Sequence, residues 1–116
     1  MDERLQNLMN NFKNPQNYFE MEDFTHKFKK NNSNCGDSFE LFLKVNNENV
    51  IEKASFTGKG CSISTSGFSL ITEFLIGKKI NEINEKDFLD FVGVSLNTNK
   101  KKCLLMSYES IKNNKI

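Results

Sequence analysis

The first stretch of the chain carries apolar residues at spacings of three and four. These residues share one face of a predicted helix over residues 3–13: Leu5, Leu8, Met9 and Phe12. Pro15 should end this helix, because the residue before a proline is pushed out of the helical region.

Apolar and polar residues then alternate in three segments, which is the period of a strand with one buried face. The alternation predicts strands over residues 24–28, 39–45 and 50–56. Residues 31–37 are predicted as a loop, and residues 46–49 as a turn that makes the second and third strands antiparallel neighbours. Strand character should stop at the glycines of residues 58–60.

The second half of the chain returns to helical spacing. It predicts one helix from Cys61 to near Gly77, a second over residues 84–95 and a last one that begins near Cys103. One helix, three strands and then helices indicate an α+β fold, a three-stranded antiparallel sheet with helices packed on one side. The length of 116 residues predicts a single domain over residues 1–116.

Composition and charge limit the kinds of partner that we expect for this protein. The formal net charge is +1, so no strong field recommends a nucleic-acid partner. The N-terminus is polar and no apolar run reaches the roughly 18 residues of a membrane span. We therefore expect a cytoplasmic protein without a membrane partner.

Three cysteines cannot complete a disulfide framework, and each lies at a predicted junction between elements. Cys35 and Asp37 are two apart, so in an extended segment their side chains point the same way. Cys61 lies at a predicted helix start, where the helix dipole lowers a thiol pKa. The lysines of residues 100–102 should act on the pKa of Cys103 in the same direction, so both are predicted thiolates.

Three thiolates and one carboxylate suit zinc, or an iron-sulfur cluster with incomplete cysteine ligation. Three unrelated, buried cysteines explain the spacing equally well, and the residues alone leave both interpretations open. His26, the only histidine, lies between two phenylalanines and is favoured as a strand residue over a ligand. No histidine base accompanies the hydroxyls after Cys61, which are interpreted as helix-start residues: Ser62, Ser64 and Thr65.

Four short motifs carry a resemblance to a known family. They are Asn-Pro-Gln-Asn at residues 14–17, Asn-Cys-Gly-Asp at 34–37, Gly-Lys-Gly-Cys-Ser-Ile-Ser at 58–64 and Lys-Cys at 102–103. In this order they closely resemble the U-type iron-sulfur scaffolds, the SufU, IscU and NifU N-terminal-like proteins. The likeness runs over nearly the whole chain.

The resemblance implies that Cys35, Asp37, Cys61 and Cys103 surround a metal ion or a nascent cluster. It also implies two kinds of partner: a pyridoxal-phosphate cysteine desulfurase of the SufS/IscS type, which supplies persulfide sulfur, and apo iron-sulfur proteins or carriers. In the IscU branch a [2Fe-2S] cluster is built from iron and sulfur. In the SufU branch the site holds zinc, and the cysteine that matches Cys35 is displaced from the metal and accepts sulfur.

The branch is marked by the residues near Cys103. IscU proteins carry histidine where this chain has Lys102, and residues 93–102 lack the prolines of the IscU chaperone motif. The 41 residues between Cys61 and Cys103 are closer to the IscU length. The site residues favour a zinc-dependent sulfur acceptor, an accessory protein rather than a stand-alone enzyme, with Cys35 as acceptor and Cys103 as the alternative. The remaining interpretation is a [2Fe-2S] scaffold.

Overall fold

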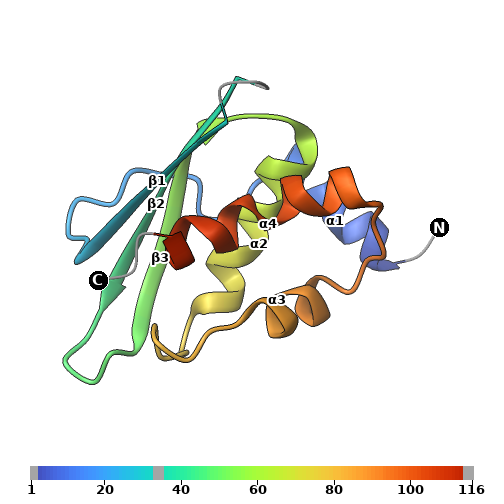
Figure 1. Cartoon of the computed structure of the whole chain (residues 1–116). Helices are drawn as coiled ribbons and strands as arrows, with labels where there is room; N and C mark the ends of the chain where they lie inside the picture. Colours follow the sequence, from blue (N-terminus) through green and yellow to red (C-terminus); the bar gives the residue numbers. More distant parts are fainter. Residues whose placement is uncertain (1–2, 33–35, 114–116) are drawn as a thin grey trace.

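A computed structural model describes residues 3–32 and 36–113 of the chain. Its elements, in chain order, are α1 (Glu3–Lys13), β1 (His26–Asn32), β2 (Asp37–Val45), β3 (Ile51–Lys59), α2 (Ser62–Leu75), α3 (Glu85–Val92) and α4 (Thr98–Asn113). Figure 1 shows the helices on one side of the sheet. The predicted α+β architecture, a three-stranded antiparallel sheet with helices on one side, is therefore confirmed.

The sheet has the order β1-β2-β3, with both pairs antiparallel. β1 begins at His26 and continues until Asn32 pairs with Asp37, so the predicted strand over residues 24–28 was placed too early. The predicted loop over residues 31–37 also starts inside β1 and ends inside β2. The alternation missed this half of the hairpin because β1 is an edge strand, and edge strands carry exposed lysine and asparagine.

β3 runs three residues further than predicted, through Gly58 to Lys59. Gly58 pairs with Phe39 at a φ of 130°, a backbone conformation that favours glycine. A Cβ at Gly58 would lie 2.2 Å from the carbonyl oxygen of Ser38. The glycine therefore continues the strand, where the sequence pattern predicted its end.

Three phenylalanines hold α2 against the sheet. The ring of Phe68 on α2 stacks on Phe39 of β2 at a centroid distance of 4.3 Å and lies 5.8 Å from Phe56 of β3. All three are at most 1% exposed. Burying each ring contributes about 2–3 kcal/mol of transfer free energy, so this stack fixes the start of α2 over the start of β2.

α2 also carries buried hydroxyls that bind the segment after α1. Ser69 donates to the side chain of Asn11 at 2.6 Å and accepts the backbone N–H of Gln16 at 2.7 Å. Asn17 donates to the hydroxyl of Thr72 at 3.0 Å. The Asn-Pro-Gln-Asn segment is thus anchored on α2, and α1 ends before Pro15, as predicted.

The last two helices begin at polar caps. The side chain of Asn84 accepts the N–H of Asp87 at 2.9 Å, and α3 ends at Gly93 in the left-handed conformation, earlier than the predicted residue 95. Asn97 accepts the N–H of Lys100 at 2.9 Å, and α4 begins at Thr98. The prediction that the last helix begins near Cys103 was wrong, because the lysine run is the first part of the helix.

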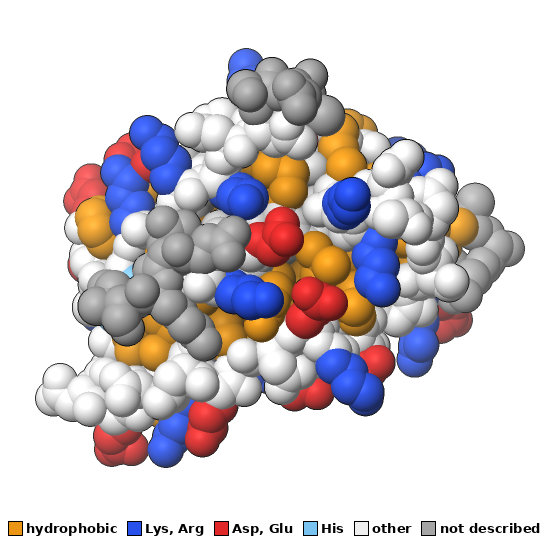
Figure 2. Space-filling view, viewed as in Figure 1, with side chains coloured by type: hydrophobic (Ala, Val, Ile, Leu, Met, Phe, Trp, Pro, Cys, Tyr) orange, Lys and Arg blue, Asp and Glu red, His pale blue; other side chains and the backbone are white. Residues whose placement is uncertain are grey.

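Charged side chains are mixed over the surface. Figure 2 shows lysines and arginines interspersed with acidic side chains on the face drawn, without a large patch of one sign. Among the helices of the described residues, none combines the length and the apolar character that crossing a membrane requires.

Candidate functional site

Three elements bring predicted site residues together at one end of the sheet. Asp37 is the first residue of β2, Cys61 is the N-cap residue of α2, and Cys103 lies in the second turn of α4. Cys35 falls in residues 33–35, which lie outside the described part of the chain. The site is therefore described here from three of its four predicted ligands.

The carboxylate of Asp37 is buried, with 3% of the residue exposed, and both of its oxygens have partners. Oδ1 accepts the backbone N–H of Cys61 at 3.1 Å, and Oδ2 accepts the hydroxyl of Ser64 at 3.3 Å. Because a buried carboxylate needs hydrogen bonds, these two contacts fix the start of β2 against the start of α2.

Gly60 makes this close approach possible. A Cβ at Gly60 would lie 2.7 Å from Oδ1 of Asp37 and 2.6 Å from the ring of Phe39. Contacts that short do not occur between real side chains, so any larger residue would displace the carboxylate or the ring. Glycine at this position therefore lets the chain turn from β3 into α2 beside Asp37.

Ser64 joins the acidic and the thiol parts of the site. Its hydroxyl lies 3.2 Å from the thiol of Cys61 and 3.3 Å from the sulfur of Met106 on α4, in addition to its bond to Asp37. From the sequence, Ser64 was predicted only as a helix-start residue and was not assigned to the site. Its spacing of three from Cys61, which puts both on one helix face, is the signal that could have indicated it.

Gly67 brings α4 close enough for its cysteine to join the site. A Cβ at Gly67 would lie 2.5 Å from the carbonyl oxygen of Leu104, so only glycine allows α2 and α4 this contact. The next residue towards the N-terminus of α4 is Cys103, whose thiol lies close enough to that of Cys61 for each to shift the pKa of the other. The helix contact therefore positions the two thiols.

The two thiols differ in acidity. Partial burial opposes ionisation of Cys61, but hydrogen bonds from Ser64 and Cys103 outweigh it and lower the pKa of the Cys61 thiol. Burial and the hydrogen bond to Cys61 raise the pKa of the Cys103 thiol. The predicted direction is confirmed for Cys61. It was wrong for Cys103, because partial burial and the neighbouring thiol disfavour its charge and the lysine run does not compensate.

The donor set suits a metal ion by its chemistry. Two thiols and a carboxylate in one hydrogen-bonded network are the ligand types that zinc prefers. Within residues 3–32 and 36–113, no three histidine, cysteine, aspartate or glutamate side chains are already arranged to hold an ion. Asp37 uses its oxygens for Cys61 and Ser64 in this arrangement, so a metal would draw the carboxylate and the thiols together.

Other candidate residues lie away from the thiols or on the rim. His26 pairs with Leu43, six positions along the hairpin from Asp37, a separation of roughly 20 Å along a strand. Lys102 is exposed beside Cys103. The two residues lie in different places: His26 packs near Phe28, whereas Lys102 lines a cavity of about 280 Å³ that Cys103 also borders.

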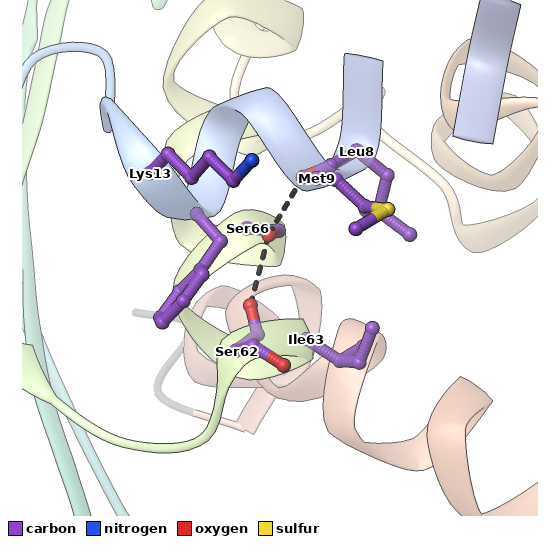
Figure 3. A pocket seen from close by; sticks show the side chains of 7 residues that line it. Leu8, Met9, Lys13, Ser62, Ile63 and Ser66 are labelled. Carbon is purple, nitrogen blue, oxygen red and sulfur yellow. Dashed lines mark hydrogen bonds between the residues drawn. The ribbon is translucent and has the colours of Figure 1, made fainter. Parts of the chain in front are cut away.

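An apolar hollow of about 270 Å³ lies between α1 and the first turns of α2, next to Cys61. Figure 3 shows Leu8, Met9 and Lys13 on one side and Ser62, Ile63 and Ser66 on the other. Ser66 closes its floor by donating to the carbonyl oxygens of Leu8 and Ser62. Met9 and Phe12, each 45% exposed, leave the rim of the hollow apolar.

Comparison with models of known protein families assigns the chain to one of them. The model of the NifU-like N terminal domain matches residues 3–114, nearly the whole chain. The chain therefore belongs to the NifU-like N-terminal domain family, which confirms the resemblance to the SufU and IscU proteins.

Individual relatives agree with this family. The chain is 37% identical over 73 residues to the zinc-dependent sulfurtransferase SufU of Bacillus subtilis, covering 63% of the chain and 48% of that protein. It is 44% identical over 52 residues to the iron-sulfur cluster assembly scaffold protein IscU of Thermotoga maritima, covering 45% of the chain and 36% of that protein. The matches thus span less than half the length of these curated relatives.

Solved structures share the fold. The crystal structure of FiSufU from Fervidobacterium Islandicum AW-1 superposes with a TM-score of 0.76 at 20% identity and covers 93% of both chains. The N-terminal part of a nitrogen-fixing NifU-like protein from Brucella abortus gives a TM-score of 0.74 at 12% identity, covering 93% of this chain and 88% of that one. At these identities the likeness shows the fold alone.

Proposed function

We propose that this protein is a zinc-dependent sulfur acceptor in iron-sulfur cluster assembly, which takes persulfide sulfur from a cysteine desulfurase and passes it on. The observation that carries the proposal is the network in which Asp37, Cys61 and Cys103 meet around Ser64. Family membership and the likeness to the zinc-dependent sulfurtransferase SufU of Bacillus subtilis support it. We propose the cytoplasm as its location.

In this proposal Asp37, Cys61 and Cys103 hold the metal together with Cys35. Zinc would keep the thiols deprotonated and would hold the ligands from three elements in one place. The residues already favour this arrangement, since the lowered pKa of Cys61 makes its proton the easier of the two to release.

The sulfur acceptor is then Cys35. Its thiolate attacks the outer sulfur of the persulfide on the desulfurase, a new S–S bond forms on Cys35, and the desulfurase cysteine leaves as a thiolate. The step exchanges one S–S bond for another, so it needs no added oxidant or reductant. Asp37, Cys61 and Cys103 retain the metal while Cys35 reacts.

The direct test is a desulfurase assay with the Cys35→Ala variant. We expect the variant to lose stimulation of the desulfurase while its helical circular dichroism stays native. Ser38→Ala is a matched control, because this exposed hydroxyl on β2 bonds to the side chain of Asn31, and its loss should leave stimulation unchanged. Native stimulation by Cys35→Ala would contradict the proposal.

A second candidate function is a scaffold on which a [2Fe-2S] cluster is assembled and transferred to apo-proteins. The observation that favours it is the 44% identity to the IscU of Thermotoga maritima, together with the short, IscU-like spacing between Cys61 and Cys103. This function predicts visible cluster absorbance after anaerobic reconstitution with iron and sulfide. A protein that purifies only with tightly bound zinc counts against it.

A purely structural zinc is disfavoured by the position of the core. Within the described part of the chain, the phenylalanine stack and the other buried apolar residues pack without contribution from Cys61 and Cys103. A chelator should therefore remove the metal and leave most of the helical signal in place. Unfolding on metal removal would instead support a structural role.

A further inference from the structure

Ser64 differs from other buried hydroxyls of the helices. Ser66 and Thr72 on α2, and Ser107 on α4, each donate to a carbonyl oxygen of their own helix. Ser64 is as deeply buried, with 0% exposure, yet its hydroxyl contacts side chains from three different elements: Asp37 of β2, Cys61 at the α2 cap and Met106 of α4.

We propose that Ser64 is a positioning residue, which sets the geometry of the Asp37 carboxylate relative to the Cys61 thiol so that both can ligate one metal ion. The proposal rests on the proposed function, because it takes these two residues as ligands. It assigns Ser64 no contact with the metal. Its hydroxyl acts through the two side chains that it bonds.

The hydrogen-bonding capacity of the hydroxyl explains the arrangement. A serine hydroxyl has one donor proton and two acceptor lone pairs, so it can bond to Oδ2 of Asp37 and to the sulfur of Cys61 at the same time, and either atom can be the donor in the contact with Cys61. The carboxylate is the stronger acceptor, since the sulfur of Met106 accepts only weakly. Ser64 therefore links a ligand on the sheet to a ligand on the helix.

The backbone contact of Asp37 cannot do this alone. Oδ1 is fixed by the N–H of Cys61, but one hydrogen bond leaves the carboxylate free to rotate about it. The bond from Ser64 to Oδ2 fixes the second oxygen and thus the plane of the carboxylate. Groups that orient metal ligands in this way typically change metal affinity about 10- to 100-fold when they are removed.

The test compares zinc affinity, by competition with a chelator, and the cobalt(II) absorption spectrum in four purified proteins. These are the native chain, Ser64→Ala, Ser64→Thr and the control Ser107→Ala, whose lost hydroxyl is equally buried but bonds to a helix carbonyl. We expect a zinc affinity about 10- to 100-fold lower and an altered cobalt spectrum for Ser64→Ala only. Threonine keeps the hydroxyl and should restore both.

Several outcomes overturn the inference. Native affinity and spectrum in Ser64→Ala, with or without a lowered unfolding midpoint, would reduce Ser64 to a structural residue and leave the proposed function standing. If the alanine variant does not fold, Ser64→Gly, which also lacks the hydroxyl, takes its place with the same expectations. If the native chain and a Cys61→Ala variant both fail to bind zinc, the proposed function fails as well.

Discussion

The two ends of α2 use buried hydroxyls for different purposes. In the first turn, the hydroxyl of Ser64 contacts a carboxylate and a thiol. Roughly one and a half to two turns later, Ser69 contacts the side chain of Asn11 on α1 and the backbone of Gln16, and Thr72 contacts the side chain of Asn17. All three are hydroxyl residues with 0% exposure, so the role of each hydroxyl is set by what the fold places opposite it.

Because of this difference, substitutions at different positions of α2 should affect either the metal site or the stability of the fold. Substitutions at the second end should weaken the fold and leave the metal site intact, whereas substitutions in the first turn should mainly change the site. The helix contact at Gly67 lies between the two ends and should affect both.

Gly67→Ala is expected to have the largest effect. The added methyl would lie 2.5 Å from the carbonyl oxygen of Leu104, so α2 and α4 must separate and the two thiols with them. We expect the free energy of unfolding to fall by about 3 kcal/mol, and zinc affinity to fall with it. Denaturant unfolding and chelator competition measure the two. Gly77→Ala, where a Cβ meets nothing within 4 Å, should lose less stability and keep its zinc affinity.

Ser69→Ala should affect only the fold. It leaves the buried side chain of Asn11 without the hydroxyl that now donates to it at 2.6 Å, and the N–H of Gln16 without its acceptor. We expect a loss of about 2 kcal/mol in the free energy of unfolding, with zinc affinity unchanged. A zinc affinity as low as that of Ser64→Ala would erase the distinction between the two ends of α2.

Gly60→Ala tests the contribution of the sheet to the metal site. Its Cβ would displace either Oδ1 of Asp37 or the ring of Phe39. We expect the free energy of unfolding to fall by only about 1 kcal/mol, because the connection between β3 and α2 can yield more easily than the helix contact at Gly67. We also expect a clear drop in zinc affinity, because the carboxylate of Asp37 would be displaced. Unchanged affinity would indicate that the position of Asp37 does not matter to the metal.

The smallest expected effect is a difference in thiol reactivity in the metal-free protein. The pKa of Cys61 is lowered and that of Cys103 is raised, so below the ordinary thiol pKa a larger fraction of Cys61 is thiolate. Cys61 should therefore be alkylated several-fold faster than Cys103 near neutral pH. The difference should shrink as the pH rises above both pKa values. Peptide mapping by mass spectrometry measures both rates, and faster alkylation of Cys103 would contradict the assignment.

Much of the fold could be predicted from local patterns. The alternation that ends at Val45 and the helical spacing after Cys61 both reflect one buried face, which each element shows in its own sequence. β1 was displaced because half of it is polar and exposed at the sheet edge. The start of α4 was missed because lysine is a good helix former that also occurs in loops.

Less of the site than of the fold could be predicted from the sequence. The cap position of Cys61 follows from local spacing. The expected pairing of Cys35 with Asp37 involves a residue outside the described part of the chain and stays a prediction. The role of Ser64 depends on Asp37 and Met106, which lie 27 and 42 residues away in the chain, and a serine near a helix start is explained equally well as a cap. The raised pKa of Cys103 likewise depends on its contact with Cys61, which only the packing of α4 on α2 creates.

The central claim is that the thiols at the first turn of α2 and on α4 form a metal site. Its most direct test is the zinc content of anaerobically purified protein, measured for the native chain, Cys61→Ala, Cys103→Ala and the control Ser107→Ala. The account predicts one zinc ion per chain in the native protein and in Ser107→Ala, and loss of stoichiometric zinc in both cysteine variants. Cysteine variants that retain as much zinc as the native chain would contradict it.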